Sequence, residues 1–142
     1  MTTPQPPTNR RRRPIWLMLL VFWCLVIFAL SAQPDLRVAH NDLADFVVRK
    51  LAHVVTYGAL ALLASMTFRQ EGQPLTRLPI GAALFSLLYA ASDEWHQTFV
   101  TGRHGSPVDV AIDMIGVTLV ALLLQLRMRA RTISTTSSGE LP

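Results

Sequence analysis

Four runs of apolar residues alternate with polar connections along this 142-residue chain. Each run is close to the ~20 residues that an α-helix needs to cross the hydrocarbon core of a bilayer. The pattern therefore predicts an all-α, polytopic membrane protein with four transmembrane helices. The predicted helices cover residues 14–31, 51–68, 78–99 and 107–126.

The two ends of the chain differ from the apolar runs in composition. Residues 1–13 are rich in proline, small polar residues and arginine, and they predict a disordered basic tail. Residues 128–142 are polar and small toward their end, and they predict a flexible C-terminal tail. One membrane domain, residues 14–127, lies between these tails.

The first apolar run has an alternative interpretation as a cleaved signal peptide. Four arginines precede the run, and the small residues Ala29, Ser31 and Ala32 lie near its end. The apolar region of a signal peptide usually has about 7–15 residues. Because residues 15–30 form a longer stretch, we expect a retained membrane anchor.

Composition and charge support lipid as the solvent and suggest an orientation. Hydrophobic residues make up 51% of the chain and charged residues 15%. The net charge of +4 does not indicate a nucleic-acid partner, because the basic residues flank the apolar runs rather than forming one exposed face. Nine of the 13 Lys and Arg residues lie on the side of both termini. The positive-inside bias therefore predicts that both termini are cytoplasmic.

Polar residues at the ends of three runs are predicted to converge near the outer membrane surface. Lys50, His53 and Tyr57 have the spacing of one helical face. A charge exposed to lipid costs roughly 2.5–3.5 kcal/mol near the bilayer centre, so such residues are expected to face the bundle interior. A single residue has simpler explanations, since Lys50 could be an interfacial anchor. The common depth of all three clusters favours a site.

The other two clusters end the third run and begin the fourth. Asp93, Glu94 and Gln97 lie within about one helical turn of each other. Ser106 is a predicted N-cap, because proline and then an acid follow it. The acids that follow are four residues apart and therefore share a face; they are Asp109 and Asp113.

These motifs resemble the VanZ-like family of small bacterial membrane proteins, named for a protein associated with teicoplanin resistance. The resemblance covers about residues 45–120. Its motifs are Lys50-x-x-His53-x-x-x-Tyr57, Asp93-Glu94-x-x-Gln97 and Arg103-x-x-Ser106-x-x-Asp109-x-x-x-Asp113-x-x-Gly116. The chain departs from the family pattern at Asp113, where asparagine is usual, and at Val120, where a second glycine is frequent.

The resemblance implies a multi-pass protein of the bacterial cytoplasmic membrane with a role in envelope chemistry. Related families have been suggested to act on lipid head groups or lipid-linked cell-wall intermediates. A polar site just below the outer surface suits such a partner.

The leading hypothesis is an enzyme, a hydrolase or transferase that acts on a phosphate-containing lipid head group. Arg103 and Lys50 are expected to hold the phosphate, and His53 is expected to act as general base or nucleophile. Either Glu94 or Asp109 is expected to orient the histidine. The candidate catalytic residues are His53, Glu94, Asp109 and Asp93. The candidate substrate-binding residues are Lys50, Tyr57, Gln97, Arg103, Ser106 and Asp113.

Two alternative functions and the possibility of a bound metal ion stay open at this level. The same cluster could bind a lipid, an antibiotic or a partner protein without chemistry, and so affect the envelope or glycopeptide susceptibility. A proton-coupled transporter is less favoured, because transporter sites tend to lie near the midplane between repeats. No resident cofactor is expected. Four carboxylates could hold Mg²⁺ or Ca²⁺, although no recognised ligand spacing supports this; they are Asp93, Glu94, Asp109 and Asp113.

Overall fold

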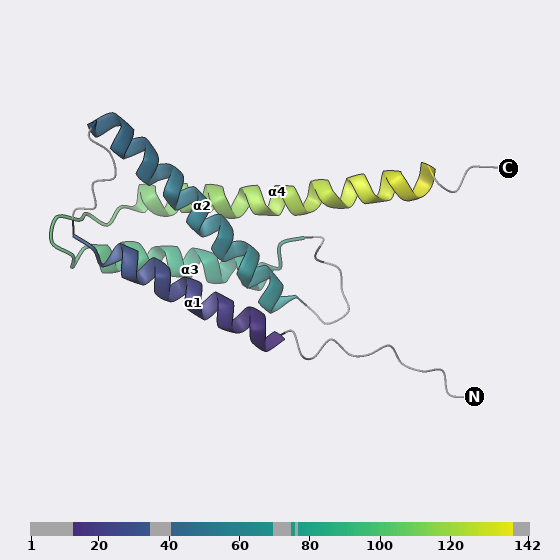
Figure 1. Ribbon diagram of the computed structural model, residues 1–142, viewed down its shortest axis with the longest axis horizontal. Helices are drawn as coiled ribbons and strands as arrows, with labels where there is room; N and C mark the ends of the chain where they lie inside the picture. The colour runs from purple at the N-terminus through teal and green to yellow at the C-terminus, as the bar shows by residue number, and fades with distance from the viewer. Residues whose placement is uncertain (1–12, 35–40, 70–74, 76, 138–142) are drawn as a thin grey trace.

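The described part of the chain contains four helices, as the sequence pattern predicts (Figure 1). They are α1 (Arg13–Ser31), α2 (Asp42–Phe68), α3 (Ile80–Gln97) and α4 (Pro107–Ser137). The computed structural model describes residues 13–34, 41–69, 75 and 77–137. The predicted tails, apart from the residues that belong to α1 and α4, lie outside these ranges.

Two helices extend beyond their apolar runs. Helix α2 begins at Asp42 rather than near residue 51, and the side chain of Asn41 caps it by accepting a hydrogen bond of 2.9 Å from the Leu43 amide. Helix α4 continues to Ser137, into the segment predicted as a flexible tail. The first five residues after 126, Arg127 to Arg131, are arginine, methionine and alanine, which favour helix. An apolar run locates a membrane-spanning core but not the polar turns that prolong it.

Three of the four helices in the described part of the chain are long and apolar enough to cross a membrane. These candidate spans are Pro14–Ser31, Asp42–Phe68 and Pro107–Ala130. Helix α3 differs because polar residues from Ser92 to Gln97 occupy its last turns. Its 18 residues reach about 27 Å at 1.5 Å per residue, close to the thickness of the hydrocarbon core.

The chain path alternates in direction through the bundle. Helices α1 and α3 run one way and α2 and α4 the other, so that the start of α1 and the end of α4 lie at the same end (Figure 1). The opposite end gathers the last turn of α1, the first half of α2, the end of α3 and the start of α4. All three predicted polar clusters lie toward this second end.

Small residues set the distance between α2 and α4, which have the most extensive contact in the bundle. A Cβ atom on Gly116 would lie 2.0 Å from the carbonyl oxygen of Val54 and 2.9 Å from the amide nitrogen of Gly58. The two backbones therefore touch, as small residues allow in membrane helices. This contact brings the polar side chains one to two turns earlier on both helices within reach of each other.

Candidate functional site

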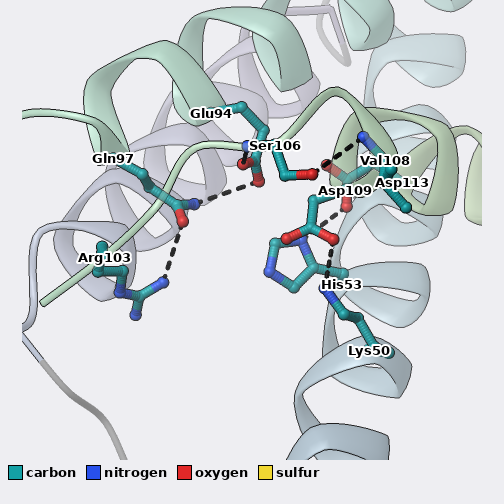
Figure 2. Close-up of polar contacts among 9 residues, drawn as sticks. All are labelled: Lys50, His53, Glu94, Gln97, Arg103, Ser106, Val108, Asp109 and Asp113. Atoms are coloured by element: carbon teal, nitrogen blue, oxygen red, sulfur yellow. Dashed lines mark hydrogen bonds and ion pairs between the residues drawn. The ribbon is translucent and has the colours of Figure 1, made fainter.

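Two charged pairs join α2 to α4 on the side of the glycine contact nearer the helix starts (Figure 2). Lys50 forms an ion pair with Asp109. One turn deeper, Nδ1 of His53 lies 2.8 Å from Oδ1 of Asp113. The Asp113 side chain is fully buried, whereas the Lys50 side chain is 26% exposed. Helices α2 and α4 run in the same direction. Two residues three positions apart on α2 therefore face two residues four positions apart on α4.

Asp113 is therefore the residue that orients His53. The sequence favoured Glu94 or Asp109 for this contact and placed Asp113 among the substrate-binding residues. Asp109 is instead engaged by Lys50, near the rim. A buried carboxylate that accepts a hydrogen bond from one imidazole nitrogen fixes the ring and its tautomer. In that tautomer the other nitrogen, Nε2, carries no proton.

Glu94 is held by the start of α4. Its Oε2 accepts a hydrogen bond of 2.8 Å from the amide of Ser106, and its Oε1 lies 3.4 Å from Nε2 of Gln97. A Cβ atom on Gly105 would lie 2.0 Å from the Glu94 carbonyl oxygen, so only glycine permits this approach. The predicted N-cap is confirmed, because Oγ of Ser106 accepts a hydrogen bond from the Val108 amide at 3.1 Å.

Gln97 links the acids of α3 to the 100–106 connection. Its Nε2 donates to Oδ2 of Asp93 at 3.2 Å, and its Oε1 accepts from Nη1 of Arg103 at 3.3 Å. Arg103 also donates to the carbonyl oxygens of Leu30 and Gln33, at 3.3 and 3.1 Å. The guanidinium thus fastens the connection to the end of α1. Two of its five N–H groups remain for a ligand.

Tyr57 packs beneath the imidazole in the interior of the bundle. Its ring lies nearly parallel to that of His53, with ring centroids 6.4 Å apart, and its side chain is buried. The phenolic oxygen has no hydrogen-bond partner among the described residues. Tyr57 therefore packs beside the histidine ring, and it also lines the apolar pocket between α1 and α2.

Two pockets meet at this cluster. The polar pocket, of about 240 Å³, lies among the starts of α2 and α4 and the 100–106 connection. The apolar pocket, of about 220 Å³, lies between α1 and α2 and includes Ile27, Leu30 and Ala52. Four residues line both pockets, and they are Arg49, His53, Gln97 and Arg103.

Residues 15–128 of the chain match the VanZ/LLP1 family. The chain belongs to this family. No curated protein and no solved structure matches the chain significantly. The family match is longer than the resemblance carried by the motifs at 45–120, because it includes nearly all of α1. The VanZ/LLP1 domain is thus a four-helix unit of a multi-pass membrane protein.

The sequence motifs did not identify two parts of the VanZ/LLP1 site, Arg49 and the wall formed by helix α1. Arg49 lines both pockets and pairs with Asp45 at 2.8 Å, but in the sequence it is one basic residue before Lys50. Helix α1 supplies the wall of the apolar pocket through side chains that any lipid-facing helix could carry. Only the packing of α1 against α2 shows which of the α1 side chains line the pocket and which face lipid.

Proposed function

We propose that this protein acts on the head group of a membrane lipid or lipid-linked envelope intermediate, at the outer face of a bacterial cytoplasmic membrane. The proposed topology has four crossings, with α3 as the fourth, and both termini in the cytoplasm. The excess of nine basic residues over four on the side of the termini supports this orientation. The polar pocket then opens outward.

The main support for the proposal is that an apolar and a polar pocket share one wall. Ile27, Leu30 and Ala52 offer hydrocarbon surface on one side of that wall, and Lys50 and Asp109 offer charge on the other. An amphipathic molecule that spans the wall would place its chain against α1 and its head group among the charges. A fully polar substrate would leave the apolar pocket unused.

The cations around the polar pocket suit a phosphate. Arg49 and Arg103 line both pockets and Lys50 lines the polar one. Each cation has a partner in the protein, but a guanidinium with several N–H groups can bind a phosphate while keeping another contact. Arg103 is the strongest candidate, because its two remaining N–H groups can bind two phosphate oxygens.

The His53–Asp113 pair supplies a proton acceptor for hydrolysis or transfer. With Nδ1 held by Asp113, Nε2 of His53 can take a proton from a water molecule or hydroxyl group as it attacks the phosphorus. Glu94, whose side chain lies near both residues, can in its protonated form give its proton to the leaving oxygen as the bond between phosphorus and that oxygen breaks. Removing such a proton-transfer group typically lowers the rate about 10²–10⁴-fold.

The test is the lipid profile of cells that overproduce the wild-type protein or the Glu94→Gln or His53→Gln variant, at matched membrane levels. We expect a change in head-group composition with the wild type that both variants abolish. The matched control is Ser92→Ala, since Ser92 lies on α3 two residues from Glu94 but is exposed on another face. This control should keep the wild-type lipid change.

Two results would count against chemistry at this site. Identical lipid profiles in all strains, including the wild type, would exclude a lipid-modifying activity in that host. Retention of the lipid change in Glu94→Gln and His53→Gln would remove these residues from the reaction. If purified wild type and Glu94→Gln retain the same bound lipid without converting it, the protein is a binding protein instead.

A further inference from the structure

Three side chains from three helices converge in the interior, below the Lys50–Asp109 pair. His53 comes from α2, Glu94 from α3 and Asp113 from α4, and each has a potential metal-ligating atom within 4.8 Å of the other two (Figure 2). Glu94 and Asp113 are buried, and His53 is mostly so. Such a set of one nitrogen and two carboxylate oxygens matches the donors of divalent transition-metal sites.

The Asp113 carboxylate has an oxygen that the protein leaves unpaired. Its Oδ1 lies on His53, while its Oδ2 is buried and has no hydrogen-bond partner within the described ranges. A buried carboxylate oxygen without a donor or a cation is costly, and such atoms are rare in folded proteins. A cation bound between Asp113 and Glu94 would satisfy this oxygen.

We infer that His53, Glu94 and Asp113 bind one divalent transition-metal ion, of the class of Zn²⁺ or Mn²⁺. Three protein ligands leave at least one position open to water or to a ligand oxygen, as in catalytic metal sites. Two carboxylates with an imidazole fit Ca²⁺ less well, because Ca²⁺ takes six to eight oxygen ligands. This inference concerns binding alone and does not depend on the proposed lipid activity.

The surroundings of the three ligands favour a fixed geometry. The Ser106 amide and the Gln97 side chain hold the Glu94 carboxylate from outside the cluster. Outer contacts of this kind orient the ligands in metal sites. The other two acids of the sequence-based metal hypothesis are engaged elsewhere, Asp109 by Lys50 and Asp93 by Gln97. The metal set that the structure favours therefore includes the histidine.

A bound ion would also change how a water molecule is activated. Such an ion converts a coordinated water molecule into a nucleophile near neutral pH. His53 would then be a ligand, and the coordinated water would replace it as the source of the attacking oxygen. Chelation separates the two cases, since a reaction that depends on free His53 persists in EDTA.

The experiment is a calorimetric titration of the full chain, purified in detergent through a tag without histidine and treated with chelator. We expect Zn²⁺ to bind with a stoichiometry of one ion per chain, and Mn²⁺ to compete for the same site. Asp113→Asn and Glu94→Gln should each weaken Zn²⁺ binding by at least about tenfold. Asp42→Asn is the control, an exposed acid in the first turn of α2 outside the cluster, and should change the affinity less than about threefold.

Gel filtration and circular dichroism of each variant establish that it is folded. If His53→Gln does not fold, Asp113→Asn and Glu94→Gln still decide the matter. Absence of Zn²⁺ and Mn²⁺ binding by the wild type would overturn the inference, as would equal Zn²⁺ affinity in the wild type and Asp113→Asn. Either result would leave the lipid proposal standing, with His53 as its proton acceptor.

Discussion

The contact between α2 and α4 has two halves that use opposite chemistry. In the polar half, Lys50 and His53 meet Asp109 and Asp113. In the glycine half, about one turn further along, the backbone at Gly58 touches that at Gly116. The glycine half contributes close packing and no ligand groups, whereas the polar half contributes ligand groups whose burial costs free energy. The site thus depends on a structural contact that lies outside it.

The largest effect is expected from widening the glycine half. Gly116→Ala places a Cβ atom 2.0 Å from the Val54 carbonyl oxygen, so the backbones must separate. We expect a loss of about 3 kcal/mol or more in the free energy of unfolding, or failure to accumulate in the membrane. Thermal unfolding in detergent measures the loss.

Gly81→Ala is the matched control for this change. The added Cβ atom would meet Phe68 at 3.9 Å, an ordinary van der Waals distance. Replacing a helical glycine by alanine should then leave stability unchanged or raise it by up to about 1 kcal/mol. Equal destabilisation by both substitutions would show that the α2–α4 contact has no special role.

The next largest effect is expected from removing one member of the buried pair. His53→Ala takes away the partner of Asp113 Oδ1 and leaves a buried carboxylate with both oxygens unpaired. In an interior this costs about 3 kcal/mol. Adding Asp113→Asn to His53→Ala should recover part of this loss, because the charge is gone.

A double-mutant cycle over these two positions measures the coupling. Unfolding of the wild type, His53→Ala, Asp113→Asn and the double variant is followed under identical detergent conditions with chelator present, so that no metal contributes. A coupling of about 1 kcal/mol or more is expected for residues in contact. Strictly additive losses would mean that the two side chains do not interact in the membrane protein.

The comparison of the two halves also explains how far the sequence predicts this molecule. The helix-face spacing of His53 and the capping motif at Ser106 are local features, and both are read directly from the chain. The pairing of His53 with Asp113 rather than Glu94 depends on how closely α2 approaches α4. That distance is set by the contact of Gly116 with the backbone at Gly58, and no local pattern reveals which residues of two helices meet.

Other features depended on contacts far apart in the chain. Arg103 looked like a free phosphate ligand, yet three of its N–H groups bind α1 and Gln97. The first turns of α2 are too polar to register as an apolar run, and they begin at a cap rather than at a change in hydropathy. Helix α3 shows the converse, because its polar end lowers its hydropathy while its neighbours keep it in the bundle.

The smallest effect is expected at the rim of the polar half. Lys50 and Asp109 are partly exposed, with side-chain exposures of 26% and 16%. Ion pairs at such positions contribute about 0–1 kcal/mol, because water and salt screen them. Lys50→Met should therefore lower the free energy of unfolding by no more than about 1 kcal/mol, well below the loss in His53→Ala.

Unfolding at low and high salt checks the origin of this loss, which should shrink as ionic strength rises. If Lys50→Met costs as much as His53→Ala and the cost is independent of salt, the rim pair is as shielded as the interior pair. The gradient of burial from Lys50 to His53 would then not govern the energetics of the polar half.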